Sequence, residues 1–175
     1  MRVDGFDAFV TAHHAEIHRF CVRVTASTSA ADDLSQETFL RAYRAYAALP
    51  ADANARAWLF AIAANLCRNH FRSEKRRRLA HEAVGALPAD SGPPGPERET
   101  LFNEGVALIE AAVAGLPLKQ RLAFVLRKLH DLDYDEVARS LECSPESARA
   151  HVFQALRKVR QSLNGHHLLA TEQRR

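Results

Sequence analysis

The chain has 175 residues, of which 47% are hydrophobic and 26% charged, a composition that is typical of globular proteins and excludes wholesale disorder. The net charge is only +3, but residues 65–80 carry six Lys/Arg and one Glu, whereas residues 1–64 carry six Lys/Arg and seven Asp/Glu, so one face is expected to meet an anionic partner. Three widely spaced cysteines, nine histidines without ligand spacing and no apolar run of membrane-spanning length predict a cytoplasmic protein without disulfide framework, metal site, cofactor or membrane insertion.

Two helices are predicted before residue 50. Apolar residues recur every three to four positions over residues 6–24, which predicts a helix over residues 4–25. Ser29 followed by Asp32 resembles a capping box and predicts a second helix over residues 30–49. The side chains of the second helix that are expected to face inward are Leu34, Phe39, Ala42, Tyr43 and Tyr46.

The outward strip of this second helix is acidic at its start and basic at its end. Its members are Asp33, Gln36, Glu37, Leu40, Arg41 and Arg44. One interpretation is pairing of Glu37 with Arg41 within the helix, which contributes only about 0.2–0.5 kcal/mol. The other interpretation is a docking face for another protein.

Residues 54–78 predict a third helix with an apolar side and a basic side. Trp58 and Ile62 recur at helical spacing on the side expected to enter a core, and Asp52 or Asn54 is expected to cap the helix. The neighbouring side is expected to present Asn65, Arg68, Arg72 and Lys75 or Arg76 to solvent. Such a row binds polyanions because each neutralised phosphate releases condensed counterions. The alternative is a solvated helix end whose cations suit its C-terminus.

Residues 87–96 are the clearest linker in the chain. Proline and glycine at this density cannot sustain helical or sheet hydrogen bonds. The predicted division is a first domain of residues 1–80, a flexible linker of residues 81–100, a second domain of residues 101–165 and a short tail of residues 166–175.

The second domain is predicted to begin with two helices. The first spans about residues 98–114 and the second about residues 118–129. The side chains that mark the inward side of the first are Leu101, Val106, Ile109 and Val113.

Two closely spaced helix starts follow. Asp133 with Glu136 three residues later predicts a short capped helix. Ser144 is a good N-cap and Pro145 suits the first helical position, so a longer helix is predicted from there. Its regular buried stripe consists of Ala148, Val152, Ala155, Val159 and Leu163. A short helix, a tight turn and a longer capped helix form helix-turn-helix architecture.

The side chains outside that stripe form a candidate DNA-reading surface. They are Ser147, Arg149, Ala150, His151, Phe153, Gln154, Arg157 and Lys158. Phe153 is an aromatic residue with little structural reason to lie there, and it could contact a thymine methyl group. Arg149 and Gln154 could read base edges or phosphates in a major groove.

Three segments, in this order, resemble a sigma factor of bacterial RNA polymerase, of the compact extracytoplasmic-function group of the sigma-70 family. Residues 31–44 (ADDLSQETFLRAYR) resemble the region 2 helix that grips the clamp helices of the largest polymerase subunit. Residues 57–72 (AWLFAIAANLCRNHFR) resemble the helix that opens and holds the −10 promoter element. Residues 116–163 are similar to region 4, which reads the −35 element. The likeness covers residues 6–78 and 104–163.

The resemblance implies two small all-α domains and a protein that is not an enzyme. The implied partners are core RNA polymerase, through the clamp helices and flap of its two large subunits, promoter DNA and an anti-sigma factor. The polymerase-binding residues would be the six of the outward strip, and a loop over residues 49–56 would capture a flipped −10 base. The implied −10 contacts are Leu49, Arg56, Trp58, Asn65, Arg68, Asn69, Arg72, Lys75, Arg76 and Arg77. The implied −35 contacts are the eight residues of the candidate DNA-reading surface.

The chain departs from the family pattern at a few of these positions. Asn69 stands where relatives often carry Asp, and Leu49 where an aromatic residue is frequent. His151 and Gln154 stand where Arg is frequent. These departures are expected to alter the base pocket and the −35 preference.

Two other classes of protein fit part of the sequence. A stand-alone helix-turn-helix regulator with a helical sensor or dimerisation domain accounts for residues 144–163 but leaves residues 33–44 and 54–78 unexplained. An interaction adaptor requires two separate basic faces to be incidental. A catalyst is not predicted, because no nucleophile, base and orienting group can be placed together and no phosphate-binding glycine loop occurs.

Overall fold

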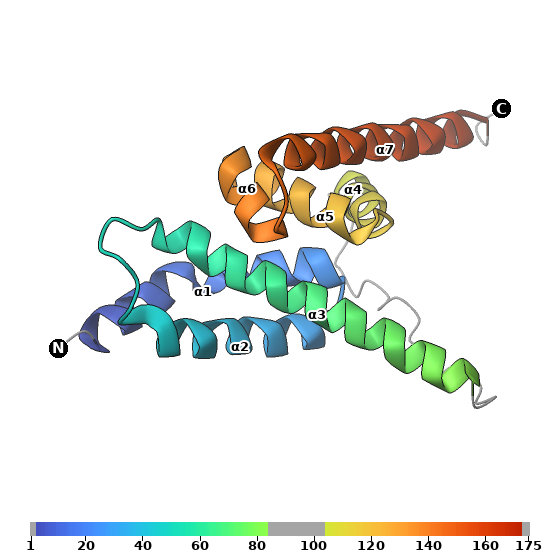
Figure 1. Ribbon diagram of the computed structural model, residues 1–175. Coiled ribbons are helices and arrows are strands. Elements are labelled where there is room, and N and C mark those ends of the chain that lie inside the picture. The colour runs from blue at the N-terminus through green and yellow to red at the C-terminus, as the bar shows by residue number, and fades with distance from the viewer. Residues whose placement is uncertain (1–2, 84–103, 173–175) are drawn as a thin grey trace. The chain divides into compact units, whose positions relative to one another are not determined.

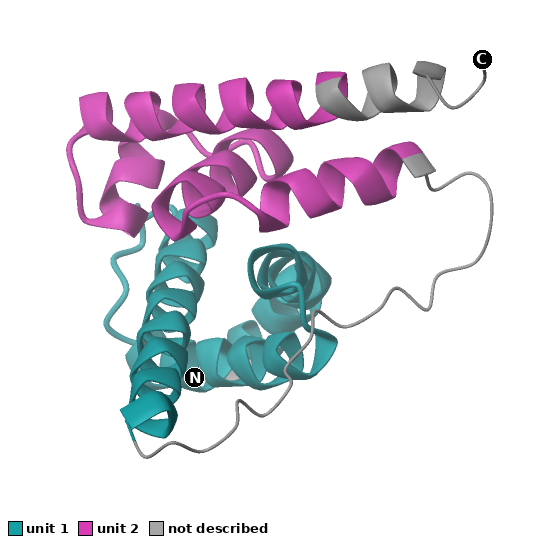
Figure 2. Cartoon of the chain, turned by 90° about the vertical axis from the view of Figure 1, so that its right-hand side faces the viewer, with its two compact units in different colours: residues 1–96 teal, residues 97–175 magenta. Residues whose placement is uncertain are grey.

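The computed structural model describes residues 3–83 and 104–172, which form seven α-helices, one π-helical turn and no strand (Figure 1). The predicted all-α fold class is therefore confirmed. The chain divides into two compact units, residues 1–96 and residues 97–175 (Figure 2). Most of the predicted linker lies outside the described residues, and its first three residues belong to a helix.

Unit 1 is a bundle of α1 (Val3–Thr25), α2 (Thr28–Tyr46) and α3 (Ala55–Ala83). Its core lies where the three helices meet. The fully buried rings of Phe20 and Phe60 pack edge to face there, with centroids 5.4 Å apart and an interplanar angle of 87°. Ring pairs in this geometry add to the stabilisation that apolar burial provides.

Two of the chain's three cysteines meet in the core of unit 1. Cys21 of α1 and Cys67 of α3 are fully buried, and neither forms a disulfide. A hydrogen bond with Cys21 and the burial of the thiol raise the pKa of Cys67 well above its usual value. Such a thiol stays protonated and packs as a small apolar side chain. The third cysteine, Cys143, lies half-buried in unit 2.

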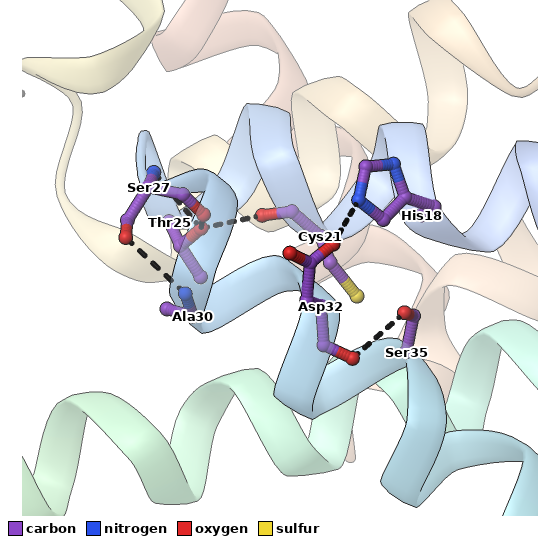
Figure 3. A network of polar contacts seen from close by, with 7 residues as sticks. All are labelled: His18, Cys21, Thr25, Ser27, Ala30, Asp32 and Ser35. Atoms are coloured by element: carbon purple, nitrogen blue, oxygen red, sulfur yellow. Dashed lines mark hydrogen bonds and ion pairs between the residues drawn. The ribbon is translucent and has the colours of Figure 1, made fainter.

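The turn between α1 and α2 sets where α2 begins (Figure 3). Ala26 adopts a left-handed conformation with φ 56°, and the Thr25 hydroxyl accepts the N–H of Ser27 at 3.2 Å. The Ser27 hydroxyl then accepts the N–H of Ala30 at 3.3 Å, which makes Ser27 the N-cap. The predicted start at Ser29 is wrong because the chain reverses earlier than the capping pattern indicated.

Asp32 serves a different purpose from the predicted capping role. Its Oδ1 lies 2.8 Å from Nε2 of His18 on α1, and its backbone oxygen accepts the Ser35 hydroxyl at 3.0 Å (Figure 3). The pair ties α2 to α1 across the surface of unit 1.

The loop of residues 47–54 connects α2 to α3. α2 ends at Tyr46, three residues before the predicted end. Asn54 Oδ1 accepts the N–H of Ala57 at 3.0 Å, so Asn54 caps α3 and the second of the two predicted candidates is confirmed.

The inward side of α2 is mostly as predicted. Leu34, Phe39 and Ala42 are buried and Tyr46 is half-buried, but Tyr43 is 54% exposed. The Tyr43 ring packs against Phe6 at the edge of the core, at a centroid distance of 5.2 Å. The expectation that Tyr43 packs inward is therefore wrong for most of its surface.

Unit 2 contains α4 (Glu104–Ala114), α5 (Leu118–Phe124), a π-helical turn (Val125–Leu129), α6 (Tyr134–Leu141) and α7 (Pro145–Glu172). Side chains from these elements form a separate buried core, which includes Val113, Leu122, Leu126, Leu132, Val137, Leu141, Val152 and Val159. α7 continues to Glu172 and so includes most of the predicted tail, residues 166–175.

The side of α4 that was predicted to face inward is only partly buried. Val113 is buried, whereas Val106 is 49% and Ile109 42% exposed, against the predicted inward orientation. Of the described residues of α4, those near its C-terminal end are the ones that other elements cover. Leu101 lies outside the described residues.

The helix-turn-helix formed by α6 and α7 is confirmed in detail. Asp133 and Glu136 cap each other's backbone N–H groups at 2.8 Å in both directions. Glu142 ends α6 in a left-handed conformation with φ 53°, and the Ser144 hydroxyl accepts the N–H of Ser147 at 3.2 Å at the start of α7. Four members of the predicted stripe, Ala148, Val152, Ala155 and Val159, are buried, and Leu163 is half-buried.

Candidate nucleic-acid and protein interfaces

The outward strip of α2 lies on the surface of unit 1. Asp33, Gln36, Leu40, Arg41 and Arg44 are exposed, and Glu37 is half-exposed. Arg41 Nε donates to Glu37 Oε1 at 2.7 Å, so the predicted pairing within the helix exists. A surface pair of this kind contributes little to stability and leaves both groups accessible to a partner.

A shallow groove runs beside this strip, between α2 and α1. Its apolar surface comes from Phe6, Phe39, Leu40 and Tyr43, and its polar rim includes His14. Leu40 is 46% exposed in addition to the exposed Tyr43, so this apolar surface faces solvent. The contribution of α1 to this groove was not predicted, because helical spacing cannot show which helices become neighbours.

The buried face of α3 differs from the predicted one. The deepest side chains are Leu59, Phe60, Ala63, Ala64 and Cys67, all at 0% exposure. Trp58 and Ile62 are only half-buried, so they lie at the edge of the core rather than within it. Asn65 and Asn69 are exposed, as expected of residues that meet a ligand.

Two of the predicted −10 contacts are engaged within unit 1. The Arg56 guanidinium forms a two-pronged ion pair with Glu16 of α1, in which Nε lies 3.1 Å from Oε2, and its Cζ lies 5.1 Å from the ring centre of Phe60. Arg68 is only 8% exposed, and its Nη2 donates to Asn65 Oδ1 at 3.4 Å. The expectation that Arg68 belongs to the exposed basic row is wrong.

The remaining basic residues lie on the C-terminal half of α3, which extends past α2 in unit 1 (Figure 1). Arg72, Lys75, Arg76 and Arg77 are all exposed. Arg77 pairs with Glu74 one turn away. Leu49 lies half-buried in the loop before α3.

The candidate DNA-reading surface of α7 is exposed around one aromatic side chain. Phe153 is 67% exposed, and Arg149, Ala150, Gln154 and Arg157 are also exposed. The other three predicted contacts, Ser147, His151 and Lys158, are half-buried. Ala150, Phe153 and Arg157 follow one another at helical spacing, so they share one face.

Arg149 is held by residues that the sequence interpretation missed. Its Cζ lies 5.1 Å from the ring centre of Tyr134, and Arg127 Cζ lies 5.2 Å from the same ring. Arg149 Nη1 is 4.0 Å from Glu146 Oε1. The ring therefore gathers two cations beside the start of α7. In the sequence, this contact could have been suspected because an aromatic residue, Tyr134, directly follows the capping residue Asp133.

The N-terminal part of α5 meets α7 at two other predicted contacts. Gln120 Nε2 donates to Gln154 Oε1 at 2.7 Å. Burial and the nearby Lys119 ammonium lower the pKa of His151, so its imidazole is neutral near pH 7. α5 therefore borders the candidate DNA-reading surface, which helical spacing within α7 could not indicate.

Metal-binding clusters and membrane-spanning helices are both absent from the described residues. No cluster of three or more His, Cys, Asp or Glu side chains in residues 3–83 and 104–172 is arranged to hold a metal ion. Within the same ranges, every helix is too short or too polar to cross a membrane.

Two family models match the chain, one on each unit. The model of sigma-70 region 2 matches residues 9–77, and the model of sigma-70 region 4 matches residues 107–159. The chain belongs to the sigma-70 family. Both matches fall on the segments that resembled the family by sequence.

Individual relatives agree with this assignment. The RNA polymerase sigma-H factor of Pseudomonas aeruginosa is 28% identical over 166 residues, which cover 91% of this chain and 86% of that protein. The ECF RNA polymerase sigma-E factor of Escherichia coli K12 is 30% identical over 131 residues, which cover 70% of this chain and 68% of that protein. These relatives place the sigma factor in the extracytoplasmic-function (ECF) group.

A solved structure shares the fold of the sigma factor. The sigma factor RpoE of Bartonella quintana, in complex with the anti-sigma factor NepR, matches with a TM-score of 0.72 at 21% identity, covering 93% of this chain and 98% of that chain. Region 2 lies in unit 1 and region 4 in unit 2. A stand-alone regulator would have no use for region 2, so the family decides against that alternative.

Proposed function

We propose that this chain is an alternative ECF sigma factor that binds core RNA polymerase and directs it to promoters read by regions 2 and 4. The observation that carries the proposal is the presence of both regions in family order, each with an exposed basic surface. In region 2 that surface lies on the C-terminal half of α3, and in region 4 it lies at the start of α7.

The polymerase-binding surface would be the outward strip of α2 with the neighbouring groove. Leu40 and Tyr43 supply exposed apolar area, and Asp33, Arg41 and Arg44 supply charges of both signs around it. An apolar centre with a polar rim is the usual anatomy of a protein interface. The clamp helices of the largest polymerase subunit are the proposed partner.

The −10 element would be held along α3. Arg72, Lys75, Arg76 and Arg77 are exposed and available to phosphates, and Asn65 and Asn69 are available to bases. Arg56 and Arg68 would act mainly by holding α3 in place, since both interact within unit 1. Leu49 and Trp58 would border the pocket for a flipped base.

The −35 element would be read by α7. Phe153 and Ala150 present apolar surface that suits thymine methyl groups, and Arg149 and Arg157 present guanidinium groups for guanine edges or phosphates. Ser147, His151, Gln154 and Lys158 complete the proposed surface. His151 would act as a neutral group, because its pKa is lowered.

Two further partners belong to the proposal. An anti-sigma factor would hold the protein inactive, as the solved relative in complex with NepR suggests by analogy. The flap of polymerase would bind region 4, for which the exposed Val106 and Ile109 of α4 offer apolar area. The protein would act in the cytoplasm.

Run-off transcription with purified core polymerase tests the proposal. Wild-type protein added to core polymerase should give transcripts with defined starts from a library of bacterial genomic fragments, and core polymerase alone should not. Defined starts at no template, together with no co-migration with core polymerase, would refute the proposal. A stand-alone regulator would instead protect DNA from nuclease without polymerase and support no initiation.

Leu40→Asp separates polymerase binding from folding. Leu40 is 46% exposed, so a charge there should leave the helix content and thermal midpoint nearly unchanged while weakening core binding about tenfold or more. Ala12→Asp is the matched control, because Ala12 is an exposed residue of α1 that does not line the groove. Equal capture of both variants by immobilised core polymerase would exclude the α2 strip as the docking face.

A further inference from the structure

The hydrogen bond between Gln120 and Gln154 joins α5 to the helix that carries the DNA-reading surface. Gln120 Nε2 donates to Gln154 Oε1 at 2.7 Å. Gln154 is exposed and lies one residue after Phe153, on the side of α7 that meets α5. Gln120 is half-buried, so it forms the fixed side of this pair.

The burial of Gln120 settles which end of its amide meets Gln154. Gln120 Oε1 is buried and has no hydrogen-bond partner among the described residues. A reversed amide would bury an NH₂ group with two donors in that place. An under-satisfied carbonyl oxygen is less costly than orphaned N–H donors. The orientation that donates Nε2 to Gln154 is therefore the favoured one.

This contact limits what Gln154 can offer to a base. A glutamine reads adenine with both ends of its amide, since Oε1 accepts from N6 while Nε2 donates to N7. Both ends must then point at one base edge. Gln154 Oε1 is directed at α5 by Gln120, which leaves the two N–H donors of Nε2 for the groove.

We propose that Gln120 is a specificity-determining residue of region 4, which turns Gln154 into a donor-only reader of the base pair that it meets. In the major groove, guanine O6 and N7 and thymine O4 accept hydrogen bonds, whereas cytosine presents the N4 donor. Gln154 therefore favours guanine or thymine over cytosine at its position. This inference rests on the proposed function, because it needs region 4 to bind promoter DNA.

The same geometry predicts the effect of changing the donor. In Gln120→Glu the carboxylate can only accept, so Gln154 must turn its Nε2 toward α5 and offer Oε1 to the groove. The preferred base edge then becomes a donor such as cytosine N4. In Gln120→Leu neither end of Gln154 is held, and the two-ended contact with adenine becomes available.

The test uses holoenzyme assembled from core polymerase and the full chain. The template is a library of promoters with a randomised upstream segment, each linked to a barcode in its transcribed region. Sequencing the barcodes of the run-off transcripts scores every base at every upstream position. Gln154→Ala flattens the preference at one position and so identifies the base pair that Gln154 meets. At that position, read on the strand that Gln154 contacts, Gln120→Glu should shift the guanine-to-cytosine ratio toward cytosine by about two- to tenfold, the range for one net hydrogen bond.

Two controls separate the proposed effect from others. Gln161→Glu adds the same charge at an exposed position of α7, two turns after Gln154. It should therefore weaken DNA binding without changing base preference. In a Gln154→Ala background, Gln120→Glu should change nothing at the identified position. If Gln120→Glu lowers the thermal midpoint of unit 2, Gln120→Leu serves as the second variant. It should shift the preference at the identified position toward adenine.

The outcomes distinguish the two levels of the proposal. Wild-type holoenzyme that initiates at no library member would refute the sigma-factor function. Wild-type holoenzyme that initiates selectively, while both Gln120 variants keep the wild-type preference at the Gln154 position, would overturn the donor-only inference alone. A preference of wild type for cytosine on the strand that Gln154 contacts would also overturn it.

Discussion

Arg68 and Arg72 lie one turn apart on α3 but in different surroundings. Arg68 is 8% exposed and donates to Asn65, whereas Arg72 is exposed. The long aliphatic part of an arginine can line a core edge while its charge finds a local acceptor, and no sequence period reports this.

The two arginines should therefore respond in opposite ways to truncation. Arg68→Ala is expected to lower the free energy of unfolding by about 1–3 kcal/mol, because it removes buried side-chain contacts. Arg72→Ala should leave stability unchanged and reduce the slope of log affinity against log salt by about 0.7–0.9 for promoter DNA. Thermal unfolding and salt titration of DNA binding check both. If Arg68→Ala weakened DNA binding without lowering the free energy of unfolding, the assignment of a structural role to Arg68 would be contradicted.

His151 predicts a pH dependence of unit 2. Burial and Lys119 lower the pKa of His151 in the folded state, so the unfolded chain, whose imidazole titrates near about 6.5, binds the proton more readily. The free energy of unfolding should fall as the pH drops from about 6.5 to the folded-state pKa. It should be insensitive to this group above that range. His151→Gln should flatten that part of the curve, as denaturant titrations above and below about pH 6.5 can measure.

At the scale of helices, local chemistry predicted some boundaries and missed others. The caps at Asn54, Asp133 and Ser144 were recognisable because a side chain there satisfies the first N–H groups of the following helix. The start of α2 was misplaced because two serines satisfy the same rule, and the left-handed conformation of Ala26 selects between them. The burial of the apolar side of α4 was overestimated. Periodicity shows which residues share a face, but it does not show whether other elements cover that face.

The two serines form a matched pair for testing the cap of α2. Ser27→Ala should lower the free energy of unfolding by about 1 kcal/mol, since it removes the acceptor for the Ala30 N–H. Ser29→Ala should change stability by less than about 0.5 kcal/mol, because Ser29 is an exposed residue inside the helix. Chemical denaturation of both variants is the measurement. Equal losses would mean that the α2 start is shared between them.

For the candidate site, the sequence predicted which side chains are exposed better than it predicted which residues contact one another. The exposed positions of α2 and α7 were found from periodicity alone. Tyr134 and Gln120, which contact Arg149 and Gln154, were missed because their contacts cross between helices. The ion pair of Arg56 with Glu16 spans 40 residues and was missed for the same reason. Packing between helices depends on shape and volume, which a one-dimensional pattern does not contain.

At the scale of the whole molecule, each unit has a buried core of its own. A substitution in one core should therefore destabilise one unit and spare the other. Phe20→Ala removes a fully buried ring that packs on Phe60, at a cost of about 3–5 kcal/mol to unit 1. Amide hydrogen exchange should show lost protection in α1–α3 and unchanged protection in α5–α7. Loss of protection throughout would indicate one cooperative molecule rather than two.

The distribution of cysteines offers a practical handle for spectroscopy. The thiols of Cys21 and Cys67 are sealed in unit 1, and Cys67 resists ionisation, whereas Cys143 is partly accessible at the turn before α7. Maleimide reagents attack thiolates, so a fluorophore should attach to Cys143 first in the native protein, with Cys21 and Cys67 reacting after denaturation. Mass spectrometry of digested conjugates can verify the order. A dye placed there sits beside the proposed promoter-reading helix and would report its encounter with DNA in real time without any engineered residue.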